Sequence, residues 1–518
     1  MNTIKRLLDY NDIHMASVSS IAESGGMATI VTVECHISQG LPNITIVGFA
    51  NRAVDEAKER LRAAFHASSI NFPKKRITIN LAPADIPKES SSFDLGIAMA
   101  IMKTAELVPA SSVSHTLFIG ELGLDGDMRS VRGVIGKLLA GKKKGFTEFY
   151  LPSENLAQAL LVPGITIIPL KNLHELYLHL TQASVISPVR SGAGHRPPPQ
   201  DWKSDYDFQD ISGQVRAKRV LEIAAAGGHN VLMSGPPGTG KSMLAKAFPG
   251  ILPPMDLEEI LEVTHLHSLA NHSYDKIVTE RPFRSPHHGA SETAIIGGGS
   301  SARPGEISLA HRGVLFLDEF PEYTRATIEA LRQPLEDKTI TIARAKHNAQ
   351  YPADFMLIAT SNPCPCGYYG TEKPCVCPPH LILQYQRKLS GPIIDRIDLY
   401  CEVDNIQHDT LLQRNGSAET STAVQKRVVA ARNLQQERYK SPGKSNAQLS
   451  NRDIKKWAHL EEPAETLLNK AAERLQISAR SYMRLIKVAR TIADLDNSKT
   501  ITLPHITEAI QYRRSVKS

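Results

Sequence analysis

The 518-residue sequence has no apolar run long enough for a membrane helix, which needs about 20 predominantly apolar residues. Residues 1–12 lack the apolar core of a secretory signal, so we expect a cytoplasmic protein with no membrane partner. Cysteine is also scarce: six are present, and four of them fall between residues 364 and 377. This scarcity and clustering exclude a disulfide scaffold and indicate a metal site in a reducing compartment.

Charge of one sign is not strongly favoured, since the net charge is only +7 and the pI is near 8.9. This mildly basic balance is compatible with a polyanionic partner without requiring one. The hydrophobic share of 42% is ordinary for globular proteins, and the length allows two to four domains with real cores. No internal repeat is visible.

The clearest boundary is the segment 184–204, which is rich in Pro, Gly and Ser and is predicted to be a linker. Short strand patterns before it, together with amphipathic helix patterns at 52–65 and 95–107, predict an N-terminal α+β domain at residues 1–183. An α/β domain is predicted at 205–405. A helical domain is predicted at 406–518, because apolar residues recur at helical spacing within 423–439, 464–475, 479–495 and 504–512.

One motif in the second domain carries most of the functional information. Residues 235–242 spell Gly-Pro-Pro-Gly-Thr-Gly-Lys-Ser, between a predicted buried strand and a predicted helix. This pattern and context are typical of the loop whose backbone cradles nucleotide phosphates, with Lys241 at the β- and γ-phosphates and Ser242 on Mg²⁺. The predicted nucleotide-binding residues are therefore Gly235, Pro236, Pro237, Gly238, Thr239, Gly240, Lys241 and Ser242.

A second apolar strand, residues 315–317, ends in the two carboxylates Asp318 and Glu319. We expect Asp318 to hold Mg²⁺ through its water shell. Glu319 is expected to orient and deprotonate the attacking water. The two motifs together predict an enzyme that hydrolyses ATP with Mg²⁺ as cofactor.

The clustered cysteines form two Cys-x-Cys pairs, Cys364 with Cys366 and Cys375 with Cys377. Four thiolates so close in sequence can close tetrahedrally around Zn²⁺, and such a site would be structural. The Cys-x-Cys spacing is tighter than the common Cys-x₂-Cys, so free or redox-active thiols remain the alternative.

Several longer segments resemble the magnesium-chelatase-like AAA+ ATPases. The resemblance rests on residues 281–289, 297–299, 304–306 and 310–319. Residues 10–180 resemble the N-terminal domain of the ComM/YifB group, related in fold to the Lon protease domain, through 41–48 and 80–88. The resemblance implies an α/β protein with a Lon-like N-terminal domain, a parallel-sheet AAA+ domain with hairpin inserts, and a C-terminal helical lid.

The AAA+ resemblance assigns three further residues. It implies that Asn362, at the end of an apolar strand, senses the γ-phosphate and positions the attacking water. It implies that Arg396 acts on the nucleotide of the neighbouring subunit. Arg480 is our choice among the arginines of a C-terminal helix for contact with nucleotide phosphate. A local surface charge cluster around Arg396, and a solvated helix face for Arg480, are the alternatives.

The resemblance also implies two inserted hairpins, one within residues 264–303 and one at 339–351. In a closed ring their tips would face the pore, where Arg344 and Lys346 would contact DNA phosphates. A solvated hairpin tip is the alternative.

Within the Lon-like domain, Ser92 and Lys137 fall at the positions of the Lon Ser–Lys dyad. The neighbours of Ser92 speak against catalysis, because Phe93 is bulky and Asp94 adds negative charge where an oxyanion must form. We therefore expect an inactive scaffold.

Taken with the resemblance, these features predict a ring-forming, hexameric AAA+ motor that moves DNA. The resemblance to ComM-like proteins implies branch migration of recombination intermediates during natural transformation, with single-stranded and branched DNA as partners. The alternatives are a chelatase-type motor that remodels a protein partner for magnesium insertion into porphyrin, and an ATP-dependent Lon-like protease.

Overall fold

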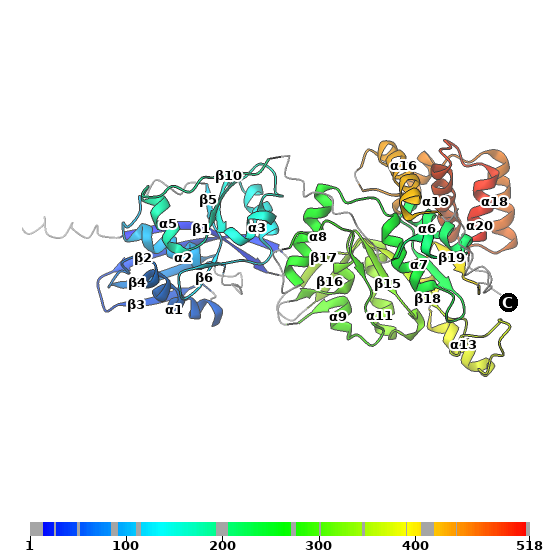
Figure 1. Ribbon diagram of the computed structural model, residues 1–518, viewed down its shortest axis with the longest axis horizontal. Helices are drawn as coiled ribbons and strands as arrows, with labels where there is room; N and C mark the ends of the chain where they lie inside the picture. Colours follow the sequence, from blue (N-terminus) through cyan, green and yellow to red (C-terminus); the bar gives the residue numbers. More distant parts are fainter. Residues whose placement is uncertain are drawn as a thin grey trace, which may run out of the picture.

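Figure 1 presents a computed structural model that describes residues 14–24, 27–48, 52–83, 92–109, 115–192, 206–270, 276–299, 302–343, 348–389, 391–405, 419–441 and 443–513. Three parts follow one another along its long axis: an N-terminal sheet with helices, a second sheet with helices, and a C-terminal group of helices (Figure 1). This mixed α/β architecture with a helical C-terminal part confirms the predicted class. Across the described ranges, no helix has both the length and the apolar character of a membrane span.

The N-terminal part is built on an eight-stranded sheet with the strand order β10-β9-β8-β5-β1-β2-β4-β3. Inward residues alternate along its strands, as in β4, where Ile77, Ile79 and Leu81 are fully buried. The predicted helices at 52–65 and 95–107 are present as α1 and α2. β10 lies inside the predicted linker and pairs with β9, so the sheet extends to Arg190.

The elements of this part are β1 (His14–Ser24), β2 (Met27–Ser38), β3 (Asn43–Val47), α1 (Arg52–Ala67), β4 (Arg76–Ala82), α2 (Asp94–Thr104), β5 (Thr116–Phe118), β6 (Glu121–Leu122), β7 (Met128–Arg129), α3 (Val134–Lys143), β8 (Glu148–Pro152), α4 (Leu156–Ala159), β9 (Thr166–Leu170), α5 (Leu173–Leu180) and β10 (Val189–Arg190).

The second part contains a five-stranded sheet with the order β12-β15-β18-β11-β19, in which each neighbouring pair is parallel. Parallel strands align their carboxyl ends along one edge, and loops at that edge form the usual ligand site of such sheets. The elements around this sheet are α6 (Val215–Gly227), β11 (Val231–Ser234), α7 (Lys241–Ala247), α8 (Leu257–Ala270), β12 (Phe283–Arg284), β15 (Val314–Leu317), α11 (Arg325–Ala330), α12 (Arg332–Asp337), β18 (Met356–Ser361), α13 (Pro379–Lys388), α14 (Gly391–Ile394) and β19 (Leu399–Glu402).

Both predicted inserts contain hairpins. The first carries β13 and β14, and the second is formed by β16 and β17, which pair antiparallel. The two hairpins touch, because a Cβ on Gly297 of β13 would lie 2.6 Å from the Cδ1 of Ile342 of β16. Arg344 and Lys346 lie outside the described residues. The insert elements are α9 (Glu292–Ile296), β13 (Gly297–Gly298), β14 (Arg303–Pro304), α10 (Glu306–Leu309), β16 (Thr339–Ala343) and β17 (Asn348–Pro352).

The C-terminal helices pack against α6 and the second sheet in one continuous core. Val428 of α16, Ile486 of α19 and Ile506 of α20 belong to the same buried cluster as Val231 of β11. The sequence placed four of these helices within two residues of their observed starts. They are α16 (Ser421–Tyr439), α18 (Glu462–Arg474), α19 (Ala479–Leu495) and α20 (Leu503–Gln511), with α17 (Asn451–Trp457) between the first two.

Helix α8 is shared by the two sheet-containing parts (Figure 1). Ile260, Leu261 and Val263 of α8 belong to one buried cluster with Ile135 and Leu138 of α3. The approach is close, since a Cβ on Gly136 would lie 2.4 Å from the ring of His265. The N-terminal part is therefore docked on the second part through an apolar interface.

Candidate active site

The phosphate-loop motif lies where the sequence predicted, between the carboxyl end of β11 and the start of α7. Gly238 and Gly240 have φ of +81° and +88°, in the left-handed region that favours glycine. Gly235 has no room for a side chain, because a Cβ there would lie 2.2 Å from the carbonyl oxygen of Val403. The Thr239 hydroxyl donates to the carbonyl oxygen of Pro236 at 3.0 Å and tightens the loop.

Lys241 points back into this loop. Its ammonium donates to the carbonyl oxygens of Gly235 at 2.6 Å and Pro236 at 2.7 Å, and to the Oδ1 of Asn362 at 3.3 Å. Burial lowers the pKa of Lys241, and the nearby Asp318 and Glu319 oppose that shift. Thus Lys241 and Asn362, which are predicted from separate motifs, meet at one point.

The carboxylates after β15 lie beside the same loop. The Ser242 hydroxyl donates to the Oδ2 of Asp318 at 3.0 Å, so this hydroxyl and this carboxylate can both ligate one hard cation such as Mg²⁺. Thr360 donates to the other oxygen of Asp318 at 2.5 Å and accepts from the backbone N–H of Glu319 at 3.0 Å. Thr360 belongs to none of the motifs that predict the site from the sequence. Its position follows from the register, in which Leu317 pairs with Ala359.

Glu319 has a second neighbour, His288, that belongs to none of the predicted site motifs. β12 and β15 are parallel neighbours that pair Phe283 with Val314, and counting on by five residues from this pair places His288 beside Glu319. The Nδ1 of His288 indeed lies 4.0 Å from the Oε2 of Glu319. Glu319 itself has a left-handed backbone with φ of +50°, and its side chain is half exposed. This places an imidazole within reach of the predicted catalytic carboxylate.

The four clustered cysteines converge. Their Sγ atoms lie within 4.8 Å of one another, and the Cys364–Cys366, Cys364–Cys375 and Cys366–Cys375 separations are 3.4, 3.7 and 3.6 Å. A tetrahedral zinc with four thiolates separates its sulfurs by about 3.8 Å, so the residues fit this ion. Backbone N–H groups of Tyr369 and Cys366 donate to the sulfurs of Cys364 and Cys377, as in a thiolate site.

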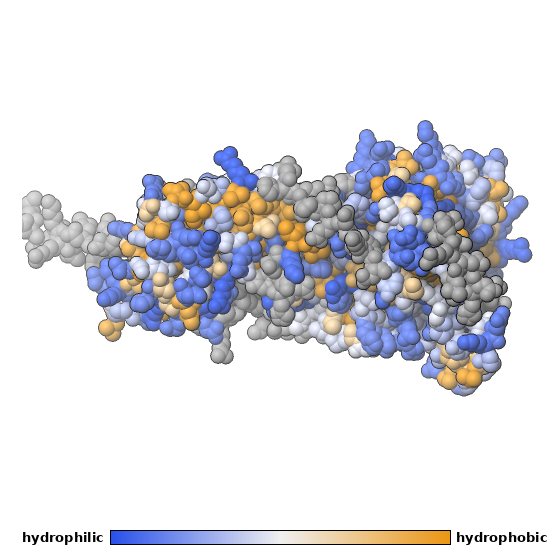
Figure 2. Space-filling model, viewed as in Figure 1, coloured by the Kyte–Doolittle hydropathy of each residue, from blue (hydrophilic) through white to orange (hydrophobic). Residues whose placement is uncertain are grey.

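The cysteine loop also touches the phosphate loop. Cys364 follows Asn362 by two residues, and a Cβ on Gly367 would lie 2.6 Å from the Cδ of Pro237. Apolar side chains of the loop and of α13 are exposed, among them Val376, Leu381 and Leu383. Figure 2 shows an orange group at the lower right, where α13 lies in Figure 1.

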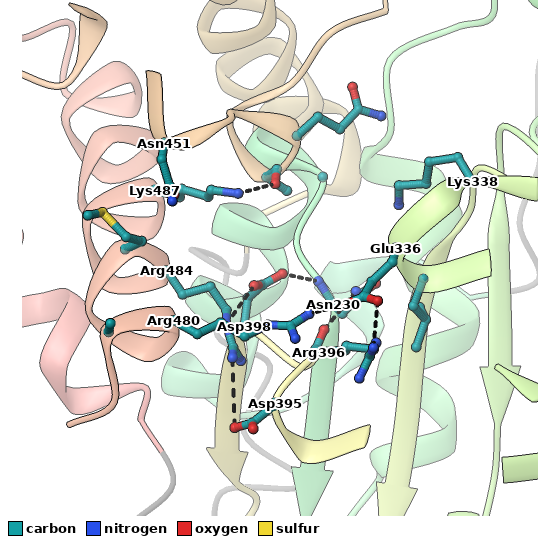
Figure 3. Close-up of a pocket in the computed structure, with 16 residues that line it drawn as sticks. Asn230, Glu336, Lys338, Asp395, Arg396, Asp398, Asn451, Arg480, Arg484 and Lys487 are labelled. Atoms are coloured by element: carbon teal, nitrogen blue, oxygen red, sulfur yellow. Dashed lines mark hydrogen bonds and ion pairs between the residues drawn. The ribbon is translucent and has the colours of Figure 1, made fainter. Parts of the chain in front are cut away.

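Arg396 and Arg480 lie together in a cavity of about 810 Å³ that is shown in Figure 3. Glu336 bridges them: its Oε2 is 2.6 Å from the Nη2 of Arg396, and its Oε1 accepts from Arg480. Partial burial raises the pKa of Glu336, but the hydrogen bonds from Arg396 and Arg480 outweigh this effect and hold it below its usual value. Sequence reasoning did not single out Glu336.

This arginine pocket, defined by Arg396, Arg480 and Glu336, lies at the opposite end of β11 from the phosphate loop. The side chain of Asn230, just before β11, donates to the carbonyl oxygen of Arg396 at 3.0 Å, whereas Gly235 follows the strand. Asn230 and Gly235 are about 16 Å apart if the strand is extended. Among the described residues that line the pocket, none belongs to the segment 235–242. The structure thus groups the two predicted arginines together but separates them from the phosphate loop of their own chain.

Ser92 and Lys137 in the N-terminal part are both buried. The Lys137 ammonium is 3.0 Å from the Oε2 of Glu23 and donates to the carbonyl oxygen of Arg132. The other oxygen of Glu23 lies 3.7 Å from the Nε2 of His265 on α8, so this cluster bridges the two parts. Lys137 is aimed at a carboxylate and a carbonyl, whereas a dyad lysine must present a free amine to its serine.

A phosphate loop at the carboxyl edge of a parallel sheet, with an acidic strand end and a polar strand end beside it, defines a P-loop ATPase domain of the AAA+ class. Family models agree with this class along most of the chain. Those described as magnesium chelatase subunit ChlI, subunit ChlI of Mg-chelatase, and magnesium chelatase subunit ChlI C-terminal match residues 207–411, 33–155 and 418–513.

Individual relatives narrow the assignment. The chain is 42% identical over 504 residues to the uncharacterized protein YifB of Salmonella typhimurium, covering 96% of this chain and 97% of that one. It is 41% identical over 505 residues to the competence protein ComM of Haemophilus influenzae, covering 97% and 98%. A magnesium-chelatase 67 kDa subunit of Heliobacterium mobile is 29% identical over only 190 residues, 31% of this chain and 28% of that one. The chain belongs to the ComM/YifB family of magnesium-chelatase-like AAA+ proteins, and this membership indicates ATPase activity with ATP and Mg²⁺.

Proposed function

We propose that this chain is a ring-forming, hexameric, ATP-dependent DNA motor that promotes branch migration of recombination intermediates, as in natural transformation. Its near full-length similarity to a competence protein supports a role in competence. The mildly basic charge of +7 is compatible with a nucleic-acid partner. The motor activity, the hexamer and the DNA substrate go beyond the family membership and are part of the proposal.

The position of the arginine pocket carries the ring part of this proposal. Arg396 is bonded to the amino end of β11, and the phosphate loop follows its carboxyl end. An arginine that acts on phosphate must come within hydrogen-bond distance of it, so Arg396 and Arg480 serve the nucleotide of a neighbouring copy. Such an arginine contributes roughly 10³–10⁵ in rate.

Within one copy, the remaining roles follow from the contacts at the carboxyl edge. Lys241 would exchange its carbonyl acceptors for the β- and γ-phosphate oxygens. Ser242 and Asp318 would hold Mg²⁺, which would neutralise phosphate charge. Glu319 orients the attacking water and takes its proton. Asn362, already bonded to Lys241, positions that water against the γ-phosphate.

The four cysteines hold a structural Zn²⁺ in this proposal, because their geometry fits a closed tetrahedral site. Zinc would fix the loop that follows Asn362 and leans on Pro237. The purified protein should contain close to one equivalent of zinc, and less than about a tenth of an equivalent would contradict the site.

Two other activities have less support. A chelatase-type motor that acts on a protein partner is favoured by the family models, but the chelatase subunit covers only 31% of this chain. A Lon-like protease is disfavoured by the pairing of Lys137 with Glu23.

The decisive experiment measures ATP hydrolysis with and without single-stranded and forked DNA, alongside displacement of a branched substrate. We expect DNA to stimulate hydrolysis and both activities to be lost in Glu319→Gln. Absence of DNA binding at low salt would contradict the DNA motor, because phosphate contacts are strongest there.

A further inference from the structure

The arginine pocket carries an excess of positive charge that is partly neutralised from within. Its lining includes the basic side chains of Lys338, Arg396, Arg480, Arg484 and Lys487, against the acidic side chains of Glu336, Asp395 and Asp398. Asp398 accepts from the backbone N–H of Asn230 at 3.0 Å, so it is already engaged with the β11 end. Glu336 is the acidic residue whose carboxylate joins the two predicted phosphate-binding arginines.

The carboxylate of Glu336 resembles a bound anion in its contacts. Each of its oxygens takes one guanidinium, from Arg396 after α14 and from Arg480 in the first turn of α19, as Figure 3 shows. Arg396 is only 12% exposed, and its buried Nε has no hydrogen-bond acceptor within the described part of the chain. The Nη1 donates to the carbonyl oxygen of Pro392 at 2.6 Å, so the Nη2 that Glu336 occupies is the donor that an incoming phosphate would need.

We propose that Glu336 is an internal competitor for the phosphates of the neighbouring subunit, which must displace this carboxylate before Arg396 and Arg480 can engage them. This inference rests on the proposed ring. Two anions cannot share the same guanidinium donors without strong repulsion, so the arginines pair either with Glu336 or with the incoming phosphate.

Release of Glu336 from the two arginines would affect the second hairpin, formed by β16 and β17. Glu336 lies near the end of α12, and only Asp337 and Lys338 separate it from Thr339, the first residue of β16. The side chain of Gln333 in α12 donates to the hydroxyl of Thr341 in β16 at 3.2 Å, so the helix and the strand are also bonded laterally. The phosphate would break the contacts of Glu336 with Arg396 and Arg480. Glu336 is thus connected directly to the hairpin that is predicted to carry the DNA-contacting residues.

The test uses Glu319→Gln protein, in which ATP persists, and measures the protein concentration at which half of the chains assemble with ATP and Mg²⁺. When Glu336→Gln is introduced into the same chain as Glu319→Gln, this concentration should fall about three- to tenfold. This is the range expected from the loss of two partly exposed ion pairs. Glu329→Gln is the matched control, because Glu329 pairs with Arg332 at 2.6 Å outside the pocket lining. It should change the concentration less than about twofold.

The outcomes separate the two proposals. Assembly of the Glu319→Gln protein with no difference between Glu336→Gln and Glu329→Gln, or weaker assembly of Glu336→Gln, overturns the role of Glu336 alone. Normal turnover in both Arg396→Ala and Arg480→Ala overturns the shared site, and Glu336 with it. Amide hydrogen exchange gives a second measure: residues 339–343 should exchange faster in Glu336→Gln without nucleotide, as they should in the assembled Glu319→Gln protein. Unchanged exchange in both would contradict the link to the hairpin.

Discussion

Two buried lysines, Lys241 and Lys137, each occupy a position where a catalytic motif places a lysine. Lys241 is held by neutral acceptors, two backbone carbonyls and the amide oxygen of Asn362. Lys137 is held by the carboxylate of Glu23. A lysine with neutral partners keeps its charge available for an incoming anion, whereas an ion-paired lysine has already used it. The difference indicates a working site in the second part of the chain and a structural tie in the first.

The largest expected effect is at the nucleotide site. Lys241→Ala should lower ATP turnover at least about a thousandfold, because it removes a preorganised charge from the phosphates. The unfolding free energy should change little, since the lysine gives up only exchangeable contacts. Steady-state hydrolysis and chemical denaturation test both statements, and turnover within tenfold of the unaltered protein would contradict the assigned role.

Lys137→Ala should show the opposite pattern. It leaves Glu23 buried without its cation, and loss of one partner of such a pair costs about 3–5 kcal/mol. We therefore expect a large fall in the denaturation midpoint, and Glu23→Gln combined with Lys137→Met should recover part of it. Equal stability of Lys137→Ala and the unaltered protein would show that the ion pair with Glu23 does not stabilise the N-terminal part.

A smaller effect is expected at His288, which sharpens the picture of the nucleotide site. His288→Ala removes the imidazole 4.0 Å from Glu319 and should lower the maximal turnover about tenfold. The apparent affinity for ATP should stay within twofold, because the imidazole is not placed at the phosphate loop. His287→Ala is the control, since its ring instead accepts from the backbone N–H of Gly289 at 3.0 Å. A change in ATP affinity alone would contradict the link to Glu319.

The smallest effect is expected for Ser92→Ala. The Ser92 hydroxyl donates to the carbonyl oxygen of Ile21 at 3.5 Å, a weak contact by length. We expect unchanged ATP hydrolysis and no casein degradation by either protein. Casein degradation that Ser92→Ala abolishes would make the N-terminal part a protease and erase the contrast between the two lysines.

Much of this site was predictable because its motifs are local. The residue types and spacing within 235–242 are enough to predict the phosphate loop. The acidic end of β15 is visible as an apolar run that stops at two carboxylates. The long C-terminal helices were equally visible from apolar spacing. Thr360 and His288 were not, because their roles depend on which strands are neighbours in the sheet. The role of Glu336 could not be predicted, because its partners Arg396 and Arg480 lie far away in the sequence. The same holds for Glu23, the partner of Lys137.

Helix α8 has a mechanical consequence. It lies inside the ATPase domain, and its residues Ile260, Leu261 and Val263 also pack in one buried cluster with α3 of the N-terminal part. A tilt of the ATPase domain during a catalytic cycle would therefore swing the whole N-terminal sheet as a lever arm. In the proposed ring, six N-terminal sheets would form a second layer that moves with the ATPase domains. This layer would lengthen the path along which a threaded strand is held.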